Sequence, residues 1–155
     1  MPDRKSAIRA EIDSAHGELM ATLDNVEDWG RAANEGWSAK DMLAHLCTIE
    51  ERQRAQIRSA LDGTPWAAED VNIYNKRMVT ERRSWTPAQL REELAREHAE
   101  TLVLFDSLRE EELDRTYQHP TRGLRTIEDV TRQVASHVRT HGSEIAAARE
   151  ASVGS

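Results

Sequence analysis

Four long segments of the chain carry apolar residues at every third or fourth position, and this spacing constrains the fold more than any other feature. In the first segment, from about Arg4 to Leu23, Ile8, Ile12 and Leu19 fall on one face of a helix. The other three stripes are Met42, His45, Leu46, Ile49, Gln53, Ile57 and Ala60; Leu90, Leu94, His98, Leu102, Phe105 and Leu108; and Ile127, Val130, Val134, His137, Val138, His141 and Ile145. Helices of about 20 residues that each bury one face against the others form a four-helix bundle, so we predict an all-α four-helix bundle.

Capping signals place the starts of three of these helices. A Ser or Thr accepts a backbone N–H at the start of a helix, and an Asp or Gln three residues later bonds back to it. The pairs are Ser38–Asp41, Thr86–Gln89 and Thr126–Asp129. Between the second and third long helices we expect a shorter helical piece from about Ala67 to Thr80, which carries Val71, Tyr74 and Val79.

A polar connection from Glu110 to Arg125 precedes the last helix. It contains Pro120 and Gly123, and we expect a long loop there. Loops of this length in a compact domain are often functional, and this one would help to form the rim of a pocket. Arg122 and Arg125 are candidate contacts for an anionic group of a cofactor or substrate, although solvated surface arginines are the simpler interpretation.

Length, charge and cysteine content narrow the classes of function. The chain has 155 residues, which suits a single domain; we assign it to residues 1–150, with residues 151–155 as a flexible tail. A net charge of -7 argues against a nucleic-acid partner, because a nucleic-acid-binding surface has to neutralise phosphates. The single cysteine excludes an intrachain disulfide, and there is neither a signal peptide nor an apolar run of about 18 residues. We therefore expect a cytoplasmic protein with no membrane partner.

Two histidines four residues apart, His137 and His141, lie on the inward stripe of the last helix. Residues at this spacing face the same way, so two imidazoles can bind one cation. Hydrogen bonds to each other or to a carboxylate would also satisfy them in a core, so the pair alone leaves both interpretations open. His45 takes an inward position on the second helix, and three histidines on two helices suit a metal site with an open position for water or substrate. Imidazole ligands suit zinc, nickel, iron or copper.

No other group in the sequence stands out as catalytic. Cys47 lies off the apolar stripe and is expected to be a core or semi-exposed residue rather than a catalytic thiol. His98 is expected to be a half-buried side chain with a hydrogen-bond partner. The chain has no Gly-rich phosphate loop, no Cys pair for zinc and no Ser nucleophile motif. The residues alone therefore name no catalytic acid, base or nucleophile.

The chain resembles the DinB-like superfamily of metal-binding four-helix bundles in three stretches, which are, in order, GWSAKDMLAHL, DVNIYNKRMVTERRSWTPAQLREEL and HVRTH. This superfamily includes mycothiol- and bacillithiol-dependent enzymes and the colibactin self-resistance hydrolases, and the resemblance covers about residues 6 to 149. It implies that His45, His137 and His141 are the metal ligands. Asn75, within VNIYNKR, would lie near the site as a cofactor or substrate contact, unless it is a surface or capping amide. His137 stands where the mycothiol-dependent maleylpyruvate isomerase branch usually has Glu, so the chain is more similar to the general or bacillithiol-transferase pattern.

Two classes of function remain. The resemblance implies a divalent-metal-dependent enzyme, a thiol S-transferase or a hydrolase active in detoxification, with zinc or nickel as the first choices of metal and iron as the next. The metal would activate water or a low-molecular-weight thiol such as mycothiol or bacillithiol to attack a small electrophilic substrate. The alternative is a bundle that binds or sequesters a metal or small ligand without turnover, or, less in keeping with three intact histidines, one that has lost its metal. Relatives are often dimers, so a homodimer is expected as well.

Overall fold

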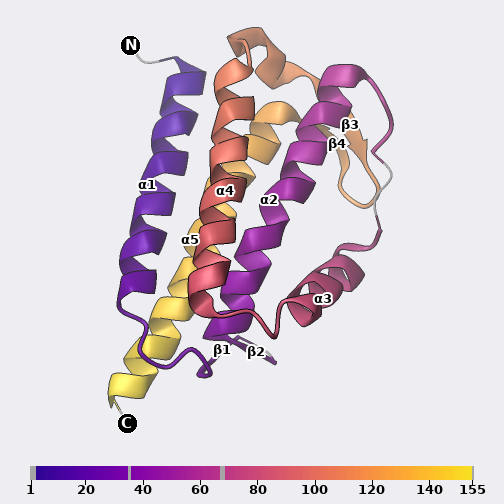
Figure 1. Ribbon diagram of the computed structural model, residues 1–155. Coiled ribbons are helices and arrows are strands. Elements are labelled where there is room, and N and C mark those ends of the chain that lie inside the picture. Colours follow the sequence, from indigo (N-terminus) through magenta and orange to yellow (C-terminus); the bar gives the residue numbers. More distant parts are fainter. Residues whose placement is uncertain (1–2, 35, 67–68, 155) are drawn as a thin grey trace.

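The computed structural model describes residues 3–34, 36–66 and 69–154, and within them four long helices form a bundle (Figure 1). In chain order the elements are α1 (Arg4–Asp24), β1 (Ala32–Asn34), β2 (Trp37–Ser38), α2 (Ala39–Asp62), α3 (Val71–Glu81), α4 (Pro87–Ser107), the 3₁₀ helix η1 (Glu110–Asp114), β3 (Thr116–His119), β4 (Gly123–Thr126) and α5 (Ile127–Gly154). Helix α5 packs against α1 and α2, and α2 packs against α4. The predicted four-helix bundle is confirmed.

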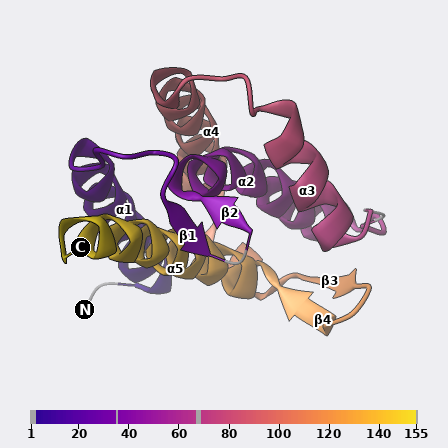
Figure 2. The ribbon, with the colours of Figure 1, turned by 90° about the horizontal axis from the view of Figure 1, so that it is seen from below.

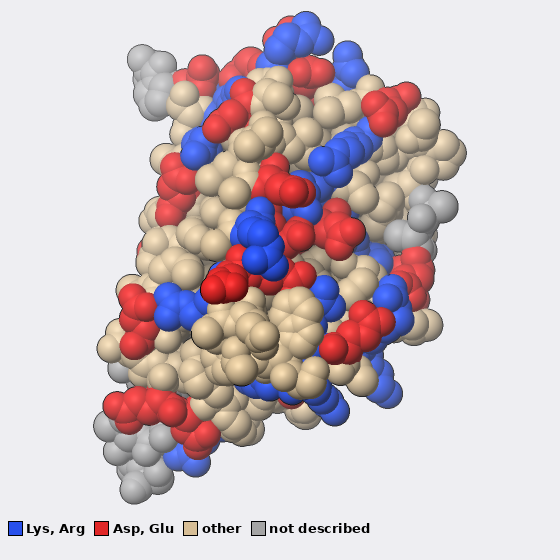
Figure 3. Space-filling model, viewed as in Figure 1, with Lys and Arg blue, Asp and Glu red and all other residues tan. Residues whose placement is uncertain are grey.

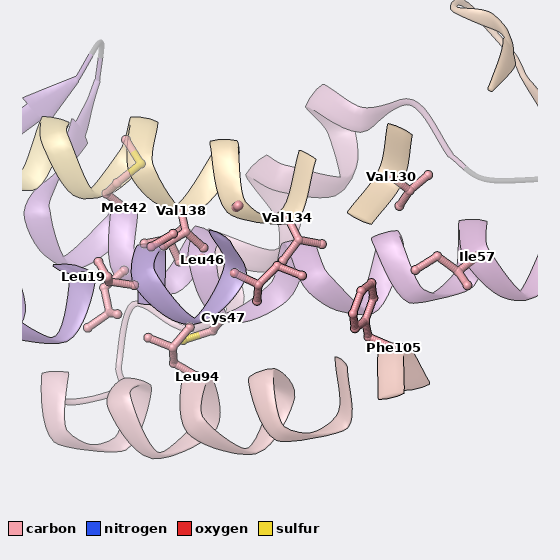
Figure 4. Close-up of a cluster of buried hydrophobic side chains, with 14 of the residues drawn as sticks. Leu19, Met42, Leu46, Cys47, Ile57, Leu94, Phe105, Val130, Val134 and Val138 are labelled. Atoms are coloured by element: carbon pink, nitrogen blue, oxygen red, sulfur yellow. The ribbon is translucent and has the colours of Figure 1, made fainter. Parts of the chain in front are cut away.

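The apolar stripes meet in one core between these helices. Figure 4 shows Leu19, Leu46, Leu94 and Val138, one from each long helix, pointing into the shared interior. The lone Phe105 is also fully buried there. Among the described residues, no helix combines the length and the apolarity needed to cross a membrane.

All three predicted capping pairs form at the starts of helices. Ser38 Oγ accepts the backbone N–H of Asp41 at 3.1 Å, and Asp41 Oδ2 accepts that of Ser38 at 3.2 Å. Equivalent reciprocal bonds join the pairs Thr86–Gln89 and Thr126–Asp129. The sequence therefore locates the first turns of α2, α4 and α5 correctly, because capping chemistry is local.

The connection before α5 is not the long loop that we expected. Residues 110–114 form η1, and β3 and β4 pair as an antiparallel hairpin with Tyr117 opposite Arg125. Tyr117 is buried and its hydroxyl donates to Gln56 Oε1 on α2 at 3.2 Å, so tertiary contacts hold a hairpin whose strands are too short to show in the polar sequence. Gly123 begins β4 with φ +74, a conformation that favours glycine.

Two other boundaries differ from those expected. Helix α3 begins at Val71 after the cap Asp70, whereas the expected start at Ala67 lies outside the described residues. Four of the five residues assigned to a tail belong to α5, and Ser155 lies outside the described residues. Figures 1 and 2 both place α3 and the β3–β4 hairpin on the side of the bundle away from α1.

Candidate metal centre and the adjoining pocket

Three histidines from two helices meet inside the bundle. His45 lies on α2, and His137 and His141 lie one turn apart on α5, which packs against α2. One ring nitrogen from each histidine lies within 4.8 Å of those from the other two. The ring centroid of His45 is 4.8 Å from that of His141 and 6.0 Å from that of His137. The fold thus brings His45 to the pair from a distant part of the sequence.

Local structure fixes the position of His45. It follows the capped start of α2 by two turns, so its place on the helix is set by the Ser38–Asp41 box. Its ring lies beside that of Trp37, with 5.3 Å between centroids, and only 2% of the residue is exposed. His45 therefore has little freedom to turn away from α5.

Burial keeps two of these imidazoles neutral. It lowers the pKa of His45 to about 3, and the neighbouring His141 and His137 lower it further. It also lowers the pKa of His137 to about 4, with His141 and Arg122 acting in the same direction and Glu144 opposing them. A neutral imidazole is the form that binds a metal, so both rings are ready to act as ligands near neutral pH.

The polar atoms of the cluster fit a cation. The Nδ1 atoms of His45 and His137 are buried and have no hydrogen-bond partner among the described residues. Buried polar atoms without partners are costly, and a bound cation would remove that cost where one of these atoms is the ligand. The remaining ring, His141, places Nδ1 3.1 Å from Glu144 Oε2, the carboxylate arrangement that orients many metal-binding histidines. Three imidazole nitrogens form a donor set for a transition metal with at least one position open.

A pocket of ≈ 140 Å³ adjoins the three histidines and shares His137 with them. Arg122 and Arg125, the predicted anion contacts, line it from the hairpin, so the structure brings both to the site. Asn75 is not among the lining residues. It lies one turn after Val71, which does line the pocket, and its buried Oδ1 has no partner among the described residues.

The pocket also contains residues that the sequence did not identify as functional. Arg52 and Gln53 line it from α2, and His119 lines it from β3. Gln53 lies on the inward stripe of the second helix, which was a usable signal, whereas Arg52 lies off that stripe and gave none. Glu144 was missed too, although it follows His141 by three residues, a spacing at which helical side chains meet.

Two further predictions concern residues outside this site. His98 is buried rather than half-buried, and its Nδ1 lies 3.3 Å from Glu50 Oε1, the hydrogen-bond partner that we expected it to have. The ring of His16 stacks on that of His98 at 3.8 Å. Cys47 is a core residue whose Sγ–H donates to the Leu90 carbonyl, and burial raises the pKa of its thiol, which removes it as a nucleophile.

Comparison with known proteins now identifies the family. The sequence profile of the DinB superfamily matches residues 6–145. Among solved structures, YfiT from Bacillus subtilis, described as a probable metal-dependent hydrolase with an unusual four-helix bundle topology, superimposes with a TM-score of 0.81 at 15% identity, over 96% of this chain and 87% of that one. An uncharacterised protein from Escherichia coli UTI89 superimposes with a TM-score of 0.76 at 14% identity, over 98% of this chain and 96% of that one. No curated protein matches the sequence. The profile spans most of the chain, and the chain belongs to the DinB superfamily.

Proposed function

We propose that the chain is an enzyme that uses a divalent metal at His45, His137 and His141 to activate water or a small thiol against an electrophilic substrate. The observation that carries the proposal is the meeting of three inward histidines at the edge of a pocket, two of them with buried nitrogens that find no hydrogen-bond partner in the described part of the chain. Zinc or nickel is the expected metal, followed by iron. When bound, such an ion supplies Lewis-acid chemistry that lowers the pKa of water or of a thiol.

The protein's own residues would hold and orient the reactants. Glu144 fixes the ring of His141, and Trp37 lies beside His45. The pocket next to His137 has room for a small substrate or for part of a thiol such as mycothiol or bacillithiol. That YfiT is described as a probable metal-dependent hydrolase supports water as the nucleophile, and the superfamily's thiol-dependent members support a thiol. We therefore test both.

Metal analysis tests the site itself. The purified chain, stripped with a chelator and reloaded with zinc or nickel, should retain about one ion per chain, because three imidazoles suffice for a tight site. His45→Ala should lose that ion. His119→Ala is the matched control, since it removes an imidazole that is outside the cluster, and it should keep full occupancy. Equal metal content in the two variants would contradict the proposal.

A measurement of catalytic turnover distinguishes an enzyme from a protein that only sequesters a metal or small ligand. The metal-loaded chain should accelerate either the reaction of a low-molecular-weight thiol with monochlorobimane or the hydrolysis of activated esters and amides, and His45→Ala should abolish the acceleration. Rate enhancement only with thiols would favour a transferase, and enhancement without them a hydrolase. A chain that binds metal but accelerates neither reaction would favour sequestration.

A further inference from the structure

Three arginines line the pocket beside the candidate metal centre without an acidic partner. None of Arg52, Arg122 and Arg125 forms an ion pair with a described carboxylate, and no Asp or Glu is among the residues that line the pocket. On the face shown in Figure 3, by contrast, basic and acidic side chains intermingle. Other arginines of the chain, such as Arg82 with Glu93, form ion pairs that neutralise their charge. The pocket is therefore a local concentration of positive charge on a chain of net charge -7.

Two of the three arginines are held in place by neutral groups. Arg52 donates to the backbone carbonyl of Glu69 at 2.8 Å, and its guanidinium lies over the ring of Trp66, 4.9 Å from the centroid. The carboxylate of Glu69 pairs with Arg77 instead. Arg125 donates to Gln133 Oε1 at 2.9 Å. These partners orient the guanidinium groups without pairing them directly with a carboxylate, although Glu69 and Asp70 act on Arg52 from a greater distance.

His119 lies close to these arginines and adds a hydrogen-bond donor to the pocket. Burial lowers its pKa, and Arg122, Arg125 and Arg52 lower it further, so it is neutral near pH 7. Its Nδ1 accepts the backbone N–H groups of Thr121 and Arg122, both at 3.1 Å. The proton of the neutral ring therefore sits on Nε2, which is a hydrogen-bond donor.

Gln53 offers polar groups to an occupant of the pocket. It is only 3% exposed, and neither its Nε2 nor its Oε1 has a partner among the described residues. The other two glutamines that line the pocket each have a partner for Oε1, since Gln56 accepts from Tyr117 and Gln133 accepts from Arg125. A buried amide without partners is costly, and a ligand with both a donor and an acceptor would remove the cost.

We propose that this pocket binds the carboxylate or phosphate group of a small acid and thereby makes the substrate of the enzyme an anion. Arg52, Arg122 and Arg125 would hold the charged group, and Gln53 would bond to a polar group next to it. Because His137 belongs both to the pocket and to the histidine cluster, an acid anchored here would present its reacting atom to the metal site. The role as substrate rests on the proposed function, whereas anion binding rests on the pocket alone.

Calorimetric titration of the zinc-loaded chain tests the proposal with defined probes. Succinate provides the carboxylate arm, inorganic phosphate the phosphate arm, and succinamide a neutral control of the same shape as succinate. We expect at least one anion to bind and succinamide not to. Arg122→Gln and Arg125→Gln should each weaken anion binding about tenfold, since a hydrogen bond to a charged group is among the stronger ones. Arg58→Gln removes an exposed arginine from α2 outside the pocket and should change nothing.

The same titrations on His45→Ala separate this proposal from the metal proposal. Anion binding to the arginines should persist in that variant with little change, whereas an anion that binds only through the metal would lose its affinity. Persistence of anion binding together with absence of metal in the wild type would overturn the proposed function and keep the anion pocket. Four outcomes would each overturn the anion pocket. These are no binding of either anion, equal binding of succinamide, loss of anion binding in His45→Ala, and anion binding that neither Arg122→Gln nor Arg125→Gln weakens.

Discussion

Glu144 controls how His141 presents its ring. The contact of 3.1 Å between Glu144 Oε2 and His141 Nδ1 places the proton on Nδ1, which leaves Nε2 as the atom able to bind a metal. A carboxylate behind a ligand histidine also makes the ring a stronger donor to the metal. The negative charge of Glu144 therefore adds to metal affinity through the ring of His141.

Glu144→Gln should lower zinc affinity about tenfold or more, because the neutral amide is a weaker acceptor for the Nδ1–H. Competition with a chromophoric chelator measures the change. Glu18→Gln, on the exposed surface of α1, is the control and should keep wild-type affinity. Equal zinc affinity in Glu144→Gln and the wild type would exclude this role.

Removal of the Gln53 amide and removal of the Gln56 amide should change the free energy of unfolding in opposite directions. Gln53→Met removes two buried atoms without partners and should raise the free energy of unfolding of the ligand-free chain by about 1 kcal/mol. Gln56→Met breaks the bond from the Tyr117 hydroxyl and should lower it by about 1 kcal/mol. Urea denaturation measures both, and a loss of stability in Gln53→Met would show that its amide is already satisfied.

At the scale of elements, α2 carries more of the site than any other helix. It supplies His45 near its start, and Arg52 and Gln53 two turns later, while α5 supplies the other two histidines. The hairpin adds Arg122 and Arg125 to the lining of the pocket that α2 and α5 begin. Accurate placement of the first turns of α2 is therefore a condition for the metal centre.

The matched capping boxes of α2 and α4 test this dependence. Ser38→Ala and Thr86→Ala should each lower the free energy of unfolding by about 1 kcal/mol, the usual contribution of an N-cap. Only Ser38→Ala should also weaken zinc binding, by up to about fivefold, because fraying of the first turns of α2 frees His45. Denaturation and chelator competition give the two numbers. Equal zinc affinity in both variants would place His45 beyond the influence of its cap.

At the scale of the whole molecule, the sequence predicted what depends on long periodic patterns and local capping. The stripes identified the four long helices and put His45, His137 and His141 at inward positions, while the family resemblance implied that the three meet at one metal. The hairpin was missed because each strand has four residues and is held by Tyr117 on Gln56, a contact between distant segments. The place of Arg52 in the pocket was missed because it too depends on the fold, which also shows that the nearby carboxylate of Glu69 is paired with Arg77.

The acid stability of the whole chain follows from its buried neutral histidines. Burial lowers the pKa of His16 to about 4, and His98 lowers it further, while Glu50 and Asp13 oppose the shift. The pKa of His45 is lowered to about 3 and that of His137 to about 4. All three imidazoles therefore stay neutral in the folded state at pH values where the same histidines in the unfolded chain, with an ordinary pKa of 6.5, take up protons. Between pH 6.5 and about 4 the unfolded state binds more protons, so stability must fall as the pH falls.

The metal-free chain should therefore lose stability steadily from pH 7 to pH 5, with a slope of up to about 1.4 kcal/mol per pH unit for each histidine that titrates on unfolding. Carboxylates with lowered pKa, such as Asp114 and Glu112, act in a lower window, below their ordinary values of 3.8 and 4.5. Urea denaturation at pH 7, 6 and 5 measures the slope, and His16→Gln should reduce it by removing one of the three groups. Stability that stays constant over this range would mean that the histidines accept protons in the folded state.

Bound zinc should add stability at pH 7 and make the loss of stability with falling pH steeper, because protons then compete with the metal for the same nitrogens.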